Sequence, residues 1–275
     1  MKCDLCGHDS SQLYCVKDKK KVLKCMFCGL VFVNKIPSKK QLSLSYNLNL
    51  ISPFHYYKDN EAEDYDSFKK RVKTLKKYVG CGSLLDVGCA TGTFMAAARD
   101  VGFTVFGIDI NRQSIGYARR KKLNAFCGEL EKFPRSKFDV VVMNDFIEHT
   151  PSPNKTMALV QSLVRKGGML YIVTPNISSV MARVFRSRWL HLKPDEHLYY
   201  FDPATIGSLL RRCGFTVLNI QSRGRIRNAR ILAWKLESYS KIMSRIVGFI
   251  PGSFLQGIRF NLNLGEEMEV IARKN

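Results

Sequence analysis

Apolar residues recur at two different spacings along this chain, and the spacings predict alternating helices and strands. Steps of three and four residues place one set on a single face of a helix: Phe68, Val72, Leu75 and Val79. Short runs of apolar and β-branched residues have the length of buried strands. The predicted strands are 83–87, 103–110, 124–128, 138–145, 168–175, 214–220 and 267–274. The predicted helices are 65–79, 93–100, 112–122, 154–165 and 203–213.

This alternation predicts an α/β fold in which helices cover both faces of a largely parallel sheet. Ligands of such sheets bind beyond the carboxyl ends of the strands, where the strand order reverses. The stretch LLDVGCATGTF lies at such an end and breaks into small residues at Gly88, Ala90 and Gly92. These residues let a ligand approach the backbone closely, and the helix that follows points its first amides into the site.

Two acids accompany the turn. Asp86 ends the strand before it, and Asp109 ends the next strand, where a carboxylate can accept hydrogen bonds from both hydroxyls of a ribose. The pattern therefore predicts an adenosine-type ligand; for Asp109 alone, a helix cap or turn former is the alternative. A dinucleotide site needs G-x-G-x-x-G, whereas GCATG has Ala90 at the second glycine and Gly92 one position too early. NAD is therefore disfavoured.

Three stretches together resemble class I S-adenosylmethionine-dependent methyltransferases. LLDVGCATGTF, VFGIDIN and FDVVVMNDFIEHTPSP are similar to the first, second and fourth strand motifs of that family, and the resemblance covers 65–222 with 265–275. It implies a Rossmann-like seven-stranded sheet and S-adenosylmethionine as cofactor, with the turn at the methionine and ribose, Asp109 at the ribose, and Gly128 and Glu129 beside the adenine. The cofactor-binding residues that it implies are Asp86, Gly88, Ala90, Gly92, Phe94, Asp109, Ile110, Gly128, Glu129, Asn144 and Asp145.

A second resemblance concerns the residues after the fourth strand. Their D-x-x-E-H pattern is similar to the E-x-x-E-H stretch of the ubiquinone-biosynthesis O-methyltransferases, whose acids and histidine are associated with a divalent metal. The resemblance implies a divalent cation at Asp145, Glu148 and His149, although Asp145 replaces the first glutamate. The alternative is that Glu148 and His149 only cap and pack the loop.

The segment 191–215 resembles the region of small-molecule methyltransferases in which the methyl acceptor lies. We predict that His197 acts there as a base or as a ligand of the acceptor; a histidine bonded within its own loop is the alternative. With Glu148 and His149, it completes the set of predicted catalytic residues. An N/D-P-P-Y/F stretch and a cysteine pair for attack on a pyrimidine are absent, which favours an oxygen or a sugar carbon as the acceptor atom.

The first 36 residues carry a doubled C-x-x-C-G pattern. Cys3 and Cys6 are followed, after eighteen residues, by Cys25 and Cys28, a spacing that presents four thiolates to zinc. Four unrelated reduced cysteines are the alternative. The module resembles a zinc ribbon, and a zinc ion caged by four cysteines has no open position for substrate. We therefore predict a structural metal.

Residues 37–64 have no sustained period and predict a linker or cap. Tyr46, Tyr56 and Tyr57 in this segment either fold over a ligand or pack the segment onto the domain.

Residues 223–264 predict a basic amphipathic helical insertion. Its apolar stripe follows steps of four and three: Leu232, Leu236, Tyr239, Met243, Ile246 and Ile250. Such a helix, over residues 223–260, lies on an anionic membrane or covers a lipid-linked substrate; alternatively it packs on the domain or on a second subunit. The sequence does not indicate an oligomeric state.

Composition narrows the class of protein. The 275 residues are 45% hydrophobic, without an apolar run of membrane-spanning length or an amino-terminal signal pattern, so we expect a cytoplasmic protein or one peripheral to the membrane. Nine cysteines, an odd number, predict metal-bound and free thiols instead of disulfides. A net charge of +21 favours contact with phosphate, on nucleic acid, anionic lipid or a nucleotide-linked substrate.

We therefore predict an enzyme that transfers a methyl group from S-adenosylmethionine to an oxygen or carbon of a small molecule: a sugar, a lipid-linked compound or a secondary metabolite. One alternative is an RNA methyltransferase that uses the zinc ribbon and the basic surface. The other is a non-catalytic binding module with a degenerate cofactor pocket, against which the intact Asp86, Gly88, Gly92 and Asp109 argue.

Overall fold

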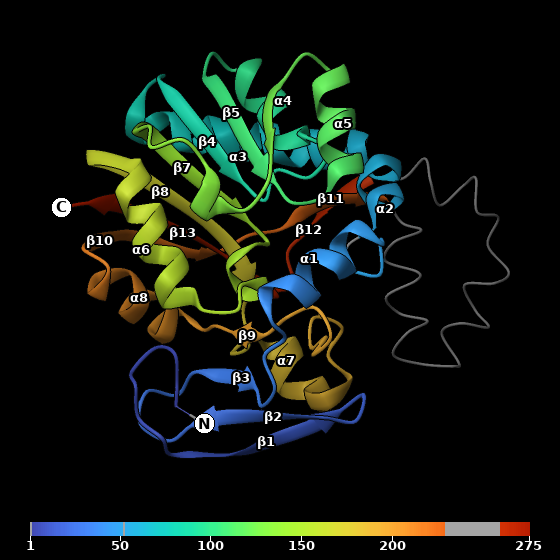
Figure 1. Ribbon diagram of the computed structural model, residues 1–275, viewed down its shortest axis with the longest axis vertical. Helices are drawn as coiled ribbons and strands as arrows, with labels where there is room; N and C mark the ends of the chain where they lie inside the picture. The colour runs from blue at the N-terminus through green and yellow to red at the C-terminus, as the bar shows by residue number, and fades with distance from the viewer. Residues whose placement is uncertain (1, 52, 229–258) are drawn as a thin grey trace, which may run out of the picture.

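The computed structural model describes residues 2–51, 53–228 and 259–275 of the chain (Figure 1). Its main element is a seven-stranded sheet in the order β10-β13-β8-β7-β4-β5-β6. The strands are β4 (Ser83–Val87), β5 (Thr104–Asp109), β6 (Asn124–Cys127), β7 (Phe138–Asn144), β8 (Val164–Pro175), β10 (Phe215–Ser222) and β13 (Glu267–Lys274). Strands β4 to β8 are parallel to one another, whereas β13 is antiparallel to both β8 and β10. The order reverses beside β4, at the centre of the sheet.

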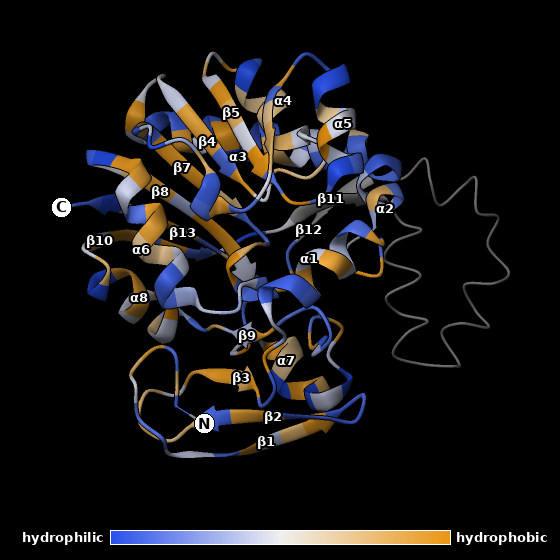
Figure 2. Ribbon diagram, in the orientation of Figure 1, coloured by the Kyte–Doolittle hydropathy of each residue, from blue (hydrophilic) through white to orange (hydrophobic). Residues whose placement is uncertain are grey.

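Helices cover both faces of this sheet because neighbouring strand residues point to opposite sides. Leu84 packs in a core with α3 (Glu61–Val79), α4 (Thr93–Arg99) and α5 (Arg112–Arg120), whereas Leu85 packs in a second core with α6 (Pro153–Leu163) and α8 (Pro203–Arg212). Figure 2 shows the apolar strands between these helices. The predicted α/β class and the predicted elements of this domain are confirmed, with ends that differ by a few residues.

Helix α3 begins at Glu61, four residues before the predicted start. Its first turn carries Glu61, Glu63 and Asp64, and its last turn carries Lys76 and Lys77. These charges favour the two ends of the helix dipole. The three acidic residues of the first turn could have predicted that the helix begins at Glu61.

The segment 37–64 contains two further helices that its sequence did not predict, α1 (Lys39–Asn47) and α2 (Phe54–Asp59). A capping box between Ser38 and Gln41 begins α1. The helix is held from outside by Asn111, whose side-chain amide donates to the carbonyl of Tyr46 at 2.7 Å. Tertiary contacts therefore order a segment that lacks an apolar period.

The amino-terminal ribbon, residues 1–36, forms a separate sheet with the order β1-β2-β3-β9. Its strands are β1 (Ser11–Lys17), β2 (Lys20–Cys25), β3 (Val31–Val33) and β9 (Tyr199–Tyr200), and all pairs are antiparallel. A two-residue turn with positive φ at Asp18 and Lys19 joins β1 to β2. The fourth strand comes from the later, main domain of the chain, as Figure 1 shows in the lower part of the molecule.

The described residues also contain three short 3₁₀ helices and one short α-helix: Leu130–Lys132, Ile147–His149, Arg186–Arg188 and α7 (Val180–Phe185). The two ends of the insertion pair as antiparallel strands, β11 (Arg225–Asn228) with β12 (Arg259–Leu262), where we expected helix. The predicted apolar stripe from Leu232 to Ile250 lies outside the described residues. Within the described ranges, no helix has the length and apolarity that crossing a membrane requires.

Candidate active site

A cavity of about 680 Å³ opens at the carboxyl ends of the central strands. We call its lining from 86–94, 109–111, 128–129 and 144–145 the cofactor end, and its lining from Tyr46, 146–149 and 190–197 the acceptor end. Helices α1 and α2 cover it, and all three predicted tyrosines of this segment line it: Tyr46, Tyr56 and Tyr57. The location agrees with the rule for ligands of parallel sheets.

The turn after β4 has the backbone conformation that its small residues allow. Gly88 has φ +78°, and a Cβ atom there would lie 2.5 Å from Cδ2 of Phe146. The amides of Gly88 and Cys89 both donate to the carbonyl of Ile108, at 2.8 and 3.1 Å. Ala90 has φ +44°, so the one alanine of the turn lies in the left-handed region that favours glycine. The sequence did not reveal that strain.

Gly92 has a different position from the rest of the predicted set. It begins α4 with φ +76°, and a Cβ atom there would lie 2.6 Å from Cδ1 of Leu123 and 3.1 Å from Cβ of Ala118. It is not among the residues that line the cavity. The glycine is therefore required by packing against α5, whereas we expected it to approach the ligand. The other ten predicted cofactor-binding residues line the cavity.

Asp109 holds the turn in place. One carboxylate oxygen accepts from the amide of Ala90 at 2.9 Å, and the other accepts from the amide of Asn111 at 2.8 Å. Burial raises the pKa of Asp109, and these amide hydrogen bonds oppose the rise. Each oxygen keeps a lone pair for a hydroxyl group. Of the two alternatives for Asp109, the helix cap does not apply, because Asn111 caps α5 by accepting from the amide of Ser114. The turn former does apply, because Asp109 accepts from the amides of Ala90 and Asn111.

Two more polar groups at the cofactor end have buried atoms without a hydrogen-bond partner in the described structure. They are Oδ1 of Asp86 and both side-chain polar atoms of Asn144. Burial, together with the nearby carboxylate of Asp109, raises the pKa of Asp86 to about 8. Unpaired buried polar atoms are costly, and two adjacent carboxylates favour a cation. These residues fit S-adenosylmethionine, which carries a sulfonium and an ammonium group.

At the acceptor end the structure brings two of the predicted histidines together. The rings of His149 and His197 lie edge to face, 4.8 Å apart between centroids. Nδ1 of His149 lies 2.9 Å from the carbonyl of Glu196, and Nδ1 of His197 lies 2.7 Å from the carbonyl of His191. Because a carbonyl oxygen can only accept, Nδ1 carries the proton in each neutral ring and Nε2 keeps its lone pair.

Burial lowers the pKa of both histidines, that of His197 strongly, so both rings are neutral near pH 7. Tyr46 presents its ring to His149 at 6.4 Å between centroids.

Glu148 lies beside these rings. Its Oε2 accepts from the hydroxyl of Thr174 at 3.0 Å, whereas Oε1 is buried without a partner in the described residues. Burial, with Asp145 nearby, raises the pKa of Glu148 well above its usual range. Potential ligand atoms of Glu148, His149 and His197 lie within 4.8 Å of one another.

The observed cluster differs in one residue from the predicted cation site. His197 belongs to it and Asp145 does not, although Asp145 lines the same cavity with φ +48°. The E-x-x-E-H comparison could not have found His197, because 48 residues separate it from His149 in the sequence. Two neutral imidazoles and one carboxylate fit a divalent metal.

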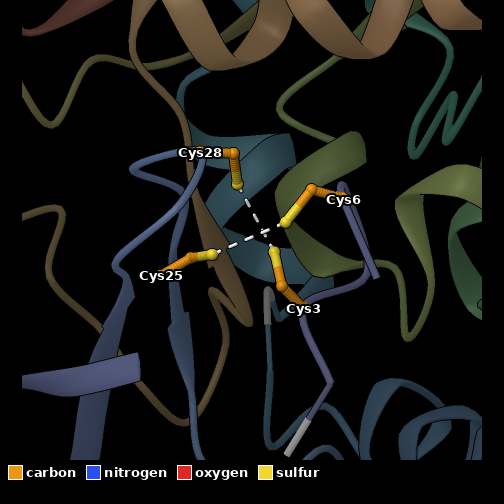
Figure 3. A group of neighbouring side chains, drawn as sticks. All are labelled: Cys3, Cys6, Cys25 and Cys28. Atoms are coloured by element: carbon orange, nitrogen blue, oxygen red, sulfur yellow. Dashed lines mark hydrogen bonds between the residues drawn. The ribbon is translucent and has the colours of Figure 1, made fainter. Parts of the chain in front are cut away.

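The four cysteines of the ribbon converge as predicted (Figure 3). The Sγ atoms of Cys3 and Cys28 are 3.5 Å apart, and those of Cys6 and Cys25 are 3.6 Å apart. All four lie within 4.8 Å of one another, a cluster that fits tetrahedral zinc with four sulfur ligands. Gly7 and Gly29, which follow the two cysteine pairs, have φ near +80°, and this conformation forms the tight turn after each pair.

Comparisons with known proteins agree with this geometry. The profile of a family described as a methyltransferase domain matches residues 57–220, more than half of the chain. The ubiquinone biosynthesis O-methyltransferase of Thiobacillus denitrificans is 29% identical over 146 residues, which cover 48% of this chain and 63% of that protein. The enzyme of the same name from Aromatoleum aromaticum is 25% identical over 146 residues, 48% of this chain and 62% of that protein. The chain thus spans less than two thirds of these two relatives.

Solved structures show the same fold. An S-adenosylmethionine-dependent methyltransferase from Thermotoga maritima superimposes with a TM-score of 0.57 at 16% identity, covering 85% of this chain and all of that one. Another from Archaeoglobus fulgidus gives 0.55 at 20% identity, covering 80% and 99%. At these identities the likeness establishes the fold alone.

Proposed function

We propose that this chain, which belongs to the methyltransferase domain family, transfers a methyl group from S-adenosylmethionine to an oxygen or carbon of a small molecule. Candidate acceptors are sugars, lipid-linked compounds and secondary metabolites. The single observation that carries the proposal is the pair of neutral histidines, buried His197 and partly buried His149, in the same cavity as the glycine turn.

At the cofactor end, the chain supplies position and charge. We propose that Asp109 accepts from the ribose hydroxyls while it fixes the turn, and that Asp86 faces the positive charge of the cofactor. S-adenosylmethionine, when bound, supplies an electrophilic methyl group. We propose that Glu129 lies beside the adenine; its neighbour Gly128 is held at this end of the cavity because its amide donates to the carbonyl of Asp109 at 2.9 Å. The turn, α1 and α2 exclude water from the reacting atoms.

At the acceptor end, the chain handles a proton. A hydroxyl acceptor must lose its proton as the methyl group arrives, and Nε2 of His149 or His197 is a base of the right kind because the Nδ1 proton is held by a carbonyl. Alternatively, Glu148, His149 and His197 would hold a divalent cation through the same Nε2 lone pairs, and that cation would lower the pKa of an acceptor hydroxyl.

The charge of the cavity supports a small molecule over RNA. Acidic side chains in the cavity lining outnumber basic ones by more than two to one, although the whole chain carries +21. Phosphates are repelled by such a lining. RNA remains a second candidate because of the net charge, and it predicts affinity that falls steeply with salt.

The first test is a calorimetric titration of zinc-replete protein with S-adenosylmethionine. We expect Asp109→Ala to lose more than about 100-fold in affinity, because it removes the ribose acceptor and frees the amides of Ala90 and Asn111. Thr104→Ala is the matched control, since Thr104 is an exposed residue of the same strand. Native protein that does not bind the cofactor would support the non-catalytic alternative.

The second test identifies the acceptor. Protein that binds the cofactor is incubated with sugars, quinols, lipid-linked sugars and RNA, and methyl incorporation is measured. Incorporation into a hydroxyl of a small molecule supports the proposal. Incorporation into RNA alone, with steep salt dependence, would replace it by the second candidate.

A further inference from the structure

The histidine loop, residues 189–201, lies between the ribbon and the 3₁₀ helix that carries Glu148 and His149. Leu198 bonds to both sides through its backbone. Its amide donates to the carbonyl of Glu148 at 2.8 Å, and its carbonyl accepts from the amide of Val33, the last residue of β3, at 3.0 Å. One residue therefore connects the ribbon to the acceptor end through its two backbone groups.

Further contacts attach the same loop to the ribbon. Strand β3 pairs with β9, so that Val31 and Phe32 lie opposite Tyr200 and Tyr199. Lys20 donates to the carbonyl of Pro194 at 3.3 Å and forms an ion pair with Asp195 at 2.5 Å.

Lys17 donates to the carbonyl of Trp189 at 3.2 Å. Trp189, Leu192 and Leu198 share one apolar core with Cys3, Cys25 and Phe32 of the ribbon. The ribbon is thus packed against the loop.

This loop supplies the groups that orient both histidines. His197 belongs to it, and the carbonyls of His191 and Glu196 accept the Nδ1 protons of His197 and His149. By contrast, the turn after β4 is fixed by Ile108 and Asp109, neither of which belongs to the ribbon or to the loop. The two ends of the cavity therefore depend on different supports.

We propose that the metal-loaded ribbon is a positioning element for the acceptor end: through β3 and β9 it fixes the tautomer and orientation of His149 and His197. A segment of about 36 residues has too small a core to fold without its metal, so loss of the metal releases β3 and with it the loop. The ribbon then controls proton removal from the acceptor and leaves cofactor binding intact. The catalytic part of this inference rests on the proposed function.

Histidine NMR tests the inference without a known acceptor. The chain has only five histidines, so the hydrogen-bonded Nδ1 protons of His149 and His197 can be assigned with His149→Gln and His197→Gln. We compare zinc-replete full-length protein with Lys20→Ala and with protein from which a chelator has removed zinc. Lys21→Ala is the matched control, because Lys21 is the exposed neighbour of Lys20 on β2.

We expect both Nδ1 proton signals to disappear on metal removal and to exchange at least tenfold faster in Lys20→Ala, with affinity for S-adenosylmethionine changed by less than twofold. Lys21→Ala should match the native protein. Signals that persist without zinc would overturn the inference, and so would a parallel tenfold loss of cofactor affinity. Failure of the proposed function gives a different result, because the native protein itself would then not bind S-adenosylmethionine.

Discussion

The cofactor end and the acceptor end of one cavity are built in different ways. The cofactor end is made mainly by backbone within a few residues of two strand ends, braced by Asp109. The acceptor end is made by side chains from separate segments, with Tyr46 on α1, Glu148 and His149 on a 3₁₀ helix, and His197 on a loop that the ribbon holds. We therefore expect that a substitution at one end of the cavity can abolish cofactor binding without affecting acceptor activation, and that a substitution at the other end can do the reverse.

The largest expected effect separates the two ends. His197→Gln removes a base and one member of the cluster with Glu148, so we expect the rate of methyl transfer to fall about 100-fold once an acceptor is known. Affinity for S-adenosylmethionine should change by less than twofold, as measured by calorimetry. His8→Gln, in the ribbon, serves as the control. An equal loss in rate and cofactor affinity would contradict the separation of the two ends.

A change at the cofactor end should have the opposite pattern. Gly88→Ala places a methyl group against Phe146 and a side chain at φ +78°, so we expect cofactor affinity to fall about tenfold and stability by about 2 kcal/mol. Calorimetry and urea unfolding measure the two effects. Adding Phe146→Ala should restore part of the affinity, because it removes the clash but not the backbone strain. If the affinity of the double variant does not recover, the backbone strain at position 88 alone causes the loss.

The pH dependence of cofactor binding reports on Asp86. Its pKa of about 8 in the free protein means that it is protonated below that pH, whereas a cationic ligand favours the carboxylate. Affinity for S-adenosylmethionine should therefore rise with pH, by at most about tenfold per unit, and level off above about pH 8. Calorimetry in buffers of different ionisation enthalpy detects the released proton.

Asp86→Asn is the control for this dependence and should lose that proton release. Without ligand, the raised pKa also affects folding. The stability that neutral Asp86 provides is complete below pH 3.8, its unfolded value, and is lost as the pH rises through about 8. Urea unfolding should therefore show Asp86→Asn gaining stability over native protein at pH 8 and not at pH 4.

The smallest effect concerns the alanine of the turn. Ala90→Gly removes a side chain at φ +44°, and we expect it to raise the free energy of unfolding by about 0.5–1 kcal/mol after the entropy of the unfolded chain is included. The backbone amide at position 90 still donates its hydrogen bond to the carboxylate of Asp109, so cofactor affinity should not fall. Ala96→Gly, inside α4, is the control and should destabilise by about 1 kcal/mol. Destabilisation by Ala90→Gly would show that the methyl group packs favourably.

Much of the fold and the cofactor end could be predicted from the sequence because the signals are local. The strand Ser83–Val87 and the helix that ends at Val79 follow from apolar spacing within one element. The turn at Gly88 follows from residue size, and the cysteine cluster follows from a repeated spacing. Each of these features depends on residues that are neighbours in the chain or in one motif.

Tertiary structure alone decided the rest. The period of residues 37–64 is too weak to predict α1, which is held by Asn111 from another element. Gly92 faces α5 and not the cavity, and β9 completes the ribbon sheet from a distant part of the chain. His149 and His197 are neighbours only because the loop of residues 189–201 packs beside the 3₁₀ helix that carries His149. Their meeting depends on how separate elements pack, and no local spacing records it.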